Sequence, residues 1–144
     1  MTVDAKTRLT LEASLENWQL VQPFRITGYV FSDVDVLFVR LSDGTHEGRG
    51  EASGVYYFDD TPAKALPQVE AVRARIEAGI TREELRQLLP PGCARNAIDC
   101  ALWELESKQQ GRTVAELAGL PPTQPMITTY SLGAYTPEKM AAGA

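Results

Sequence analysis

The residues best suited to contact a ligand lie in the segment GVYYFDDTP, residues 54–62. Three aromatic side chains, Tyr56, Tyr57 and Phe58, stand directly before two carboxylates. Successive side chains of a strand point to opposite faces, so one ring would point away from the other two, and Asp-Asp-Thr-Pro would end the strand at once. We therefore predict a loop whose rings cover either the protein's own core or a ligand.

The residue types that hold metals or form disulfides give little support for either. Cys93 and Cys100 are seven apart in a segment that reads as helix. Their Cα atoms would lie about 10 Å apart, too far for a bridge, so we expect both to be reduced and buried. The only histidine, His46, is remote from them, and no C-x-x-C spacing occurs.

The first half of the chain has the pattern of strands. Leu9, Leu11, Ala13 and Leu15 alternate with polar residues, as in a sheet with one wet face. Residues 32–44 and 46–53, on either side of a Ser-Asp-Gly turn, predict a hairpin. The return limb carries three glycines, Gly48 and Gly50 within the strand and Gly54 directly after it, which indicate a bulge or a close approach of another backbone.

The second half has the pattern of helices over 62–79, 81–90, 93–111 and 113–120. Thr81 and Glu84 have the spacing of a capping box. The polar face of the longest helix carries Arg95, Asn96 and Asp99, which we interpret as structural. A strand candidate at 126–132 and a helix beginning at Thr136 follow. A lone strand and helix are half of a βαβ unit, which indicates a cut chain.

The composition indicates one ordinary globular domain. The chain has 144 residues, 44% hydrophobic and 23% charged, with a net charge of -5. Nucleic acids and anionic membranes need clustered positive charge, so we expect neither as a partner. No apolar run is long enough for a membrane span, and the first residues lack a signal-peptide core, so we expect a cytoplasmic protein.

Three segments resemble a known enzyme group: GRGEA at 48–52, TREELRQLLPPGCARNAIDCALWELESKQQG at 81–111 and YSLGAYTPEKMA at 130–141. With the order of strands before helices, they resemble the enolase superfamily, more closely its muconate-lactonizing subgroup, and most closely the dipeptide epimerases. The resemblance runs from about residue 20 to the end of the chain.

The resemblance implies an α+β fold in two parts. Residues 1–124 would form an N-terminal capping domain, a three-stranded antiparallel sheet followed by a helical bundle. Residues 125–144 would hold the first strand and the start of the first helix of a TIM-like (β/α) barrel whose remainder is absent. The acid/base lysines and the carboxylates that hold Mg²⁺ belong to that remainder, so we assign no catalytic residue and no metal ligand in this chain.

The resemblance also implies substrate contacts. Loops 22–31 and 53–61 would close over the barrel mouth, so the rings of residues 56–58 either form a lid over the substrate or fill the seam between cap and barrel. Ser131 first, and Thr129 second, would contact the peptide portion of the substrate, unless both are ordinary barrel-interior hydroxyls. Asp60 or Thr61 is expected to cap the next helix, with a substrate ammonium as the alternative partner of the aspartate.

The remaining substrate contacts, Phe24 and Arg25, lie early in the first loop. Ala-Glu epimerases carry arginines at the positions of Phe31 and Tyr57, so the pocket here resembles one for a dipeptide with a hydrophobic residue. Arg25 still offers a guanidinium to a carboxylate from a different angle.

The resemblance implies that the chain is the substrate-recognition part of a Mg²⁺-dependent epimerase, which removes a proton next to a carboxylate. The expected substrate is a dipeptide or an N-acyl amino acid, and the expected assembly is a homo-oligomer. This isomerase would need its whole barrel, so we expect the 144-residue chain alone to be inactive. The same cap serves N-acylamino acid racemase, o-succinylbenzoate synthase and muconate cycloisomerase. If the chain is the full product, a binding or assembly module is the alternative.

Overall fold

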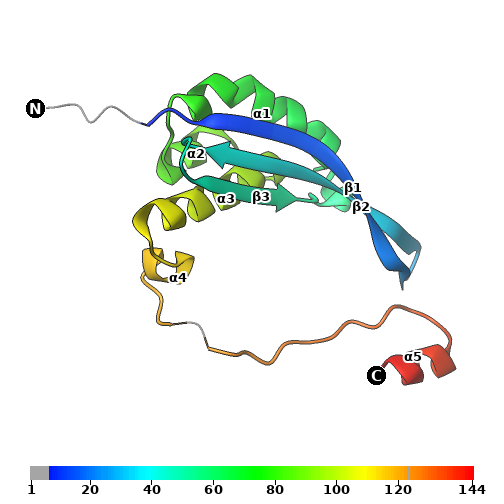
Figure 1. Ribbon diagram of the computed structural model, residues 1–144. Helices are drawn as coiled ribbons and strands as arrows, with labels where there is room; N and C mark the ends of the chain where they lie inside the picture. The colour runs from blue at the N-terminus through cyan, green and yellow to red at the C-terminus, as the bar shows by residue number, and fades with distance from the viewer. Residues whose placement is uncertain (1–6, 123) are drawn as a thin grey trace, which may run out of the picture.

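The structure, a computed structural model, describes residues 7–122 and 124–144. A three-stranded sheet carries a layer of helices on one face, and an extended C-terminal segment, residues 124–136, runs back beneath the sheet to a last short helix (Figure 1). We call residues 124–136 the arm. The elements are β1 (Thr10–Ile26), β2 (Tyr29–Ser42), β3 (Glu47–Ala52), the 3₁₀ turn η1 (Tyr56–Phe58), α1 (Pro62–Glu77), α2 (Arg82–Leu88), α3 (Cys93–Gln110), α4 (Val114–Leu117) and α5 (Pro137–Gly143).

No helix in the described ranges combines the length and the apolar character that a membrane crossing requires.

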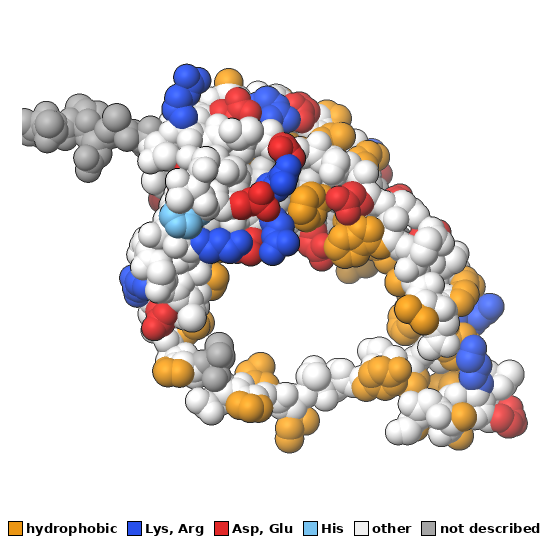
Figure 2. Space-filling view, viewed as in Figure 1, with side chains coloured by type: hydrophobic (Ala, Val, Ile, Leu, Met, Phe, Trp, Pro, Cys, Tyr) orange, Lys and Arg blue, Asp and Glu red, His pale blue; other side chains and the backbone are white. Residues whose placement is uncertain are grey.

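The sheet is antiparallel in the order β1-β2-β3, and its two faces differ as the sequence predicts. Leu11 pairs with Leu41, and both are buried under the helices. The next residues point to the other face, where Arg40 makes ion pairs with Glu12 and, at 3.2 Å, with Glu47. Paired charges are visible on this open face in Figure 2. The predicted sheet with one wet face is confirmed.

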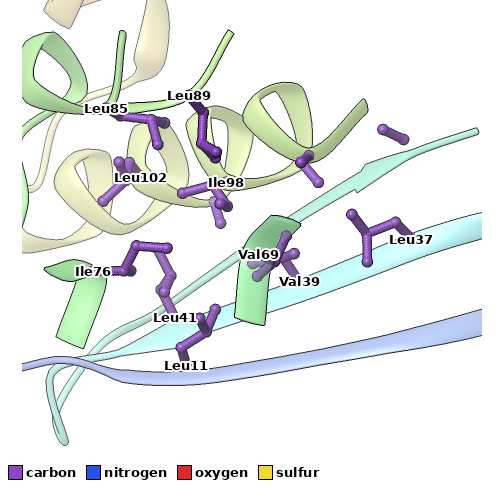
Figure 3. Packing of buried hydrophobic residues seen from close by; sticks show 14 of the residues in the cluster. Leu11, Leu37, Val39, Leu41, Val69, Ile76, Leu85, Leu89, Ile98 and Leu102 are labelled. Carbon is purple, nitrogen blue, oxygen red and sulfur yellow. The ribbon is translucent and has the colours of Figure 1, made fainter. Parts of the chain in front are cut away.

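The core fills the space between the sheet and the helices (Figure 3). It joins Leu37 and Val39 of β2 to Val69 and Ile76 of α1, all fully buried. α2 contributes Leu85 to the same cluster. Burying one such side chain contributes about 1.5–3 kcal/mol, which makes this cluster the main source of stability. α3 supplies seven further buried residues: Cys93, Ala94, Ala97, Ile98, Ala101, Leu102 and Leu105.

The glycines of β3 let α3 lie directly against the sheet. A Cβ built on Gly50 would be 2.0 Å from the carbonyl oxygen of Ala97, and one built on Gly48 would be 2.0 Å from that of Ala101. These contacts are with helix backbone, which has little freedom to move aside. The close approach predicted for the glycine-rich strand is confirmed at both positions.

The helix boundaries follow the signals in the sequence. Thr81 and Glu84 form a reciprocal capping box at the start of α2, and Thr113 with Glu116 does the same for α4. Gly111 ends α3 in the left-handed conformation, with φ of 60°. At the start of α5 the Thr136 hydroxyl accepts from the backbone of Lys139.

Two predicted elements differ from the structure. The expected loop at 22–31 is mostly strand, because β1 and β2 continue as a ribbon in which Phe24 pairs with Phe31 and Arg25 with Val30. The expected barrel strand at 126–132 is not formed; the segment has no assigned secondary structure. A strand is defined by hydrogen bonds to a neighbour. No other strand is described beside this segment to supply them.

Candidate functional site

The predicted substrate contacts lie on three segments. The first is the hairpin tip, residues 22–31, where β1 turns into β2; the second is the aromatic loop, residues 53–61, between β3 and α1; the third is the arm. The arm and the sheet enclose an opening in the space-filling view (Figure 2). The contacts of these segments decide which of the predicted residues come together.

The hairpin tip is a two-stranded ribbon that projects beyond the helix layer (Figure 1). The pairing of β1 with β2 shifts register between Gln19 and Phe24. A tight turn at Thr27-Gly28 closes the ribbon, and Gly28 has φ of 82°, which favours glycine. Neighbouring strand residues point to opposite faces, so the half-buried Phe24 and the exposed Arg25 face different sides of the tip.

The aromatic loop is closed at its base by its own backbone. The Val55 N–H donates to the Asp60 carbonyl oxygen at 2.7 Å, and the Phe58 N–H donates to the Val55 carbonyl oxygen at 2.9 Å. Gly54 has φ of 71°, and a Cβ there would be 2.1 Å from the Asp60 carbonyl oxygen. This tight base holds the tip of the loop out from the protein.

The rings of the aromatic loop are presented to the outside. Tyr57 is 69% and Phe58 75% exposed, and the two rings meet edge to face with centroids 4.7 Å apart. The side chain of Tyr56 lies outside the described part of the structure. Rings that are this exposed agree with either role inferred from the sequence, a lid over the substrate or a filler of the seam between cap and barrel. Both roles stay predictions.

Asp60 caps a different helix from the one predicted. Its Oδ2 accepts the backbone N–H of Cys93 at 2.9 Å, at the start of α3. Thr61 occupies the N-cap position of α1 but makes no side-chain capping bond. A carboxylate at a helix start satisfies a free N–H and meets the positive end of the helix dipole. Asp60 therefore ties the aromatic loop to the longest helix.

The carboxylates of the aromatic loop both have partners within the chain. Asp59 pairs with Lys64 on the exposed side of the loop. Beside Asp60, burial first and the Asp60 charge second raise the pKa of the Cys93 thiol to about 11. Cys93 is free and buried, as predicted. Cys100 is also free, as predicted, but it is exposed, contrary to the prediction that both cysteines are buried.

The arm reaches the hairpin tip. The N–H of Ala134 donates to the Arg25 carbonyl oxygen at 2.6 Å, and the Tyr135 hydroxyl donates to the Pro23 carbonyl oxygen. Ser131 and Thr129 are exposed on the same segment. The structure therefore brings the arm next to Phe24 and Arg25, while Tyr57 and Phe58 stand on a separate loop after β3.

Two other polar regions of the molecule lie apart from the predicted substrate contacts. A hollow of about 850 Å³ beside α2 and α3 contains none of the predicted contacts. Its Arg82 guanidinium lies 3.3 Å from the Trp103 ring centroid and 2.8 Å from Glu106. In the adjoining polar face of α3, Arg95 and Asn96 donate to backbone oxygens, which supports their structural interpretation.

The donors needed for a metal are not assembled in this part of the chain. Among residues 7–122 and 124–144, no three His, Cys, Asp or Glu side chains lie close enough to hold an ion. What the three segments do present is aromatic surface, one guanidinium and two hydroxyls. Such groups bind apolar side chains, carboxylates and peptide groups, so the arrangement suits recognition of a small molecule.

Sequence reasoning missed the contact that joins the arm to the hairpin tip. Tyr135 has no distinguishing spacing, and its partner Pro23 is 112 residues away along the chain. The one available signal was Gly133, the residue that directly follows the predicted strand at 126–132. A Cβ there would be 2.7 Å from the Tyr135 ring, so the glycine leaves room for that ring.

The comparison with protein families gives one match over most of the chain. Residues 8–119 match the mandelate racemase / muconate lactonizing enzyme N-terminal domain.

Two curated relatives extend the likeness. An L-Ala-D/L-Glu epimerase from Escherichia coli (strain K12) is 36% identical over 135 residues, which are 94% of this chain and 42% of the relative. A hydrophobic dipeptide epimerase from Roseobacter litoralis is 29% identical over 120 residues, which are 81% of this chain and 35% of the relative. The chain thus spans less than half the length of either protein.

Solved structures share the fold. An enolase family member from Agrobacterium tumefaciens with homology to dipeptide epimerases, with bound sodium and L-Ala-L-Glu, has a TM-score of 0.87 and 36% identity, covering 94% of this chain and 41% of that chain. A dipeptide epimerase from Methylococcus capsulatus, in complex with Mg and L-Arg-D-Lys, has a TM-score of 0.82 at 22% identity, covering 94% and 41%. The sheet and helices match the capping domain of such enzymes.

Proposed function

Because this chain belongs to the mandelate racemase / muconate lactonizing enzyme family, whose N-terminal domain it contains, we propose that it is the substrate-recognition part of a dipeptide epimerase. The observation that carries the proposal is the extent of the likeness. At 36% identity it covers 94% of the chain, well past the matched domain, and so extends into the arm. A likeness confined to the sheet and helices would support the fold alone.

The proposed reaction is the removal and return of a proton at the carbon next to a carboxylate. We propose that the lysines that move this proton, and the carboxylates that hold Mg²⁺, belong to barrel strands that follow residue 144. This placement agrees with the proposed boundary between capping domain and barrel near residue 124. Magnesium is present with the Methylococcus capsulatus epimerase, which supports this metal for the family. When bound, the metal would neutralise charge that develops on the substrate carboxylate.

The residues of this chain would bind and orient the dipeptide. The hydroxyls of Ser131 and Thr129 are exposed on the arm and available for hydrogen bonds to the peptide group. Arg25, also exposed, is available to a carboxylate. Phe24 lies between Pro23 and Arg25, the two residues of the hairpin tip that the arm contacts, and it offers apolar surface.

The aromatic loop would close the site against water. Its two described rings, Tyr57 and Phe58, are large, exposed and carried on a base fixed to α3 through Asp60. Exclusion of water strengthens every polar interaction with the substrate, and lid loops commonly provide it. With Phe31 and Tyr57 in place of arginines, we propose a dipeptide with a hydrophobic second residue.

The test is α-proton exchange in heavy water. The gene product that carries this chain is incubated with Mg²⁺ and L-Ala-L-Xaa dipeptides, where Xaa is Leu, Phe, Val, Glu or Lys, and deuterium incorporation is followed by NMR. We expect incorporation that is fastest with an apolar Xaa. A chain ending at residue 144 is the matched control and should give none.

Two outcomes would contradict the proposal in different ways. If no dipeptide incorporates deuterium while N-acyl amino acids do, the protein is an N-acylamino acid racemase rather than a dipeptide epimerase. Fastest incorporation with L-Ala-L-Glu, lost in Arg25→Ala, would keep the reaction but overturn the hydrophobic preference. Arg86→Ala, an exposed change on α2 outside the three segments, serves as the control for Arg25→Ala.

A further inference from the structure

The arm and the hairpin tip are joined by a specific contact made of two hydrogen bonds. We define it as residues 133–135 of the arm with Pro23 and Arg25 of β1. Two backbone carbonyl oxygens, one on each side of Phe24, accept hydrogen bonds from the arm, one from the Ala134 N–H at 2.6 Å and one from the Tyr135 hydroxyl. Carbonyls two residues apart lie on the same edge of a strand, so the arm covers the free edge of β1.

The ring of Tyr135 is held in place from within the arm. A Cβ on Gly133 would be 2.7 Å from Cε2 and 3.0 Å from Cζ of the ring, so the ring lies across a position that only glycine leaves open. The Lys139 ammonium of α5 lies 3.9 Å from the ring centroid, a cation–π distance. Gly133 is buried although its neighbours Ser131 and Ala134 are exposed.

The hairpin tip leaves much of its apolar surface exposed, although Tyr29 and Phe31 stack within it with ring centroids 6.2 Å apart. Ile26 is 36%, Tyr29 51% and Val30 50% exposed, although all three are large apolar residues. A two-stranded ribbon is only marginally stable unless something packs against it. The register shift between Gln19 and Phe24 also interrupts the pairing that would stiffen it from the sheet. The arm therefore supplies a support that the sheet does not.

We propose that Tyr135 is a positioning residue, which holds the hairpin tip, and with it Phe24 and Arg25, against the arm. The role in substrate binding rests on the proposed function, but the support of the tip does not. Tyr135 itself does not touch the substrate. It sets the position of residues that do, and so it links the domain that recognises the substrate to the segment that leads into the barrel.

The first measurement is amide hydrogen exchange in the wild type and three variants. In Tyr135→Phe, which removes only the hydroxyl, we expect residues 24–31 and Ala134 to exchange about 3- to 10-fold faster, the effect of losing one hydrogen bond. Gly133→Ala, which displaces the ring, should do the same. Tyr130→Phe is the matched control, because Tyr130 is 79% exposed on the same segment, and its exchange should stay within about twofold of wild type.

The second measurement is the steady-state kinetics of the same variants. A positioning residue should raise KM for the dipeptide several-fold in Tyr135→Phe and leave kcat within about twofold, because the groups that bind substrate are displaced while the proton-transfer groups are untouched. A fall in kcat at unchanged KM would overturn the binding role. Tyr130→Phe should change neither constant.

The two measurements separate the two proposals. If exchange at residues 24–31 is no faster in Tyr135→Phe and Gly133→Ala than in Tyr130→Phe, the support of the hairpin tip by Tyr135 is refuted, whatever the kinetics. If the wild type epimerises no dipeptide, the proposed function fails, and the exchange result still decides whether Tyr135 holds the tip. Faster exchange with raised KM supports both.

Discussion

Adding a methyl group at Gly50 should reveal how closely α3 lies against β3. The Cβ of Gly50→Ala would be 2.0 Å from the Ala97 carbonyl oxygen and 2.8 Å from the Ala101 nitrogen. An ordinary contact at this position begins at 3.4 Å, so the helix must move out by roughly 1.4 Å. Because α3 carries seven buried residues, that movement loosens the whole core rather than one side chain.

The expected cost of Gly50→Ala is about 1–3 kcal/mol of unfolding free energy, the range for overpacked cores. In a domain of about 100 residues this lowers Tm by roughly 4–8 °C per kcal/mol. The assay is urea unfolding and a thermal melt followed by circular dichroism at 222 nm. Glu51→Ala is the control, because Glu51 is the next residue of β3 and its side chain is exposed; its stability should stay within about 0.5 kcal/mol.

The sign of the change makes the test decisive. At a glycine whose backbone suits alanine, the substitution normally stabilises by about 0.4–1 kcal/mol, because the unfolded chain loses freedom. A Gly50→Ala protein as stable as wild type, or more stable, would refute the steric argument. Gly48→Ala should act through the same helix movement, so the double variant should cost less than the sum of the two single changes.

Two further predictions concern the junction of the aromatic loop with α3. Asp60→Ala should lose about 0.5–2 kcal/mol of unfolding free energy in urea, because the Cys93 N–H loses its cap. Lys64→Ala, which breaks the exposed pair between α1 and Asp59 of the same loop, should lose under about 0.5 kcal/mol, and equal losses would contradict the capping role. The folded-state pKa of the Cys93 thiol is about 11, above its ordinary value of 9.0, so the thiol of the unfolded chain ionises first as pH rises. The free energy of unfolding should therefore fall by roughly 2–3 kcal/mol between pH 9 and pH 11. Urea midpoints measured across this pH range should decline less in Cys93→Ala, and parallel declines would contradict the shift.

The helices and the sheet could be predicted because their signals are local. Thr81 with Glu84 and Thr113 with Glu116 specify helix starts within four residues, and the alternation around Leu11 specifies which face of the sheet is buried. The glycines of β3 also gave a correct prediction, since a strand with two glycines on one face indicates that something approaches that face closely.

The candidate site was less predictable because its contacts are not local. Asp60 was expected to cap the helix beside it, but it reaches Cys93, 33 residues further on. The ribbon around Phe24 was expected to be a loop because the resemblance implied one at 22–31, whereas the structure pairs Phe24 with Phe31 across a tight turn. Residues 126–132 have the composition of a strand, but they form none because no neighbouring strand is described beside them to supply hydrogen bonds.

The segment between α4 and the arm, which we call the linker, also sets the strength of the arm's contact with the hairpin tip. Two hydrogen bonds contribute about 0.5–1.5 kcal/mol each, whereas bringing together two separate molecules costs at least about 4 kcal/mol. A free peptide with the arm's sequence would therefore not bind the tip. The covalent connection replaces that cost with a local concentration in the millimolar range. Continuity of the linker, more than the identity of its residues, is what the contact requires.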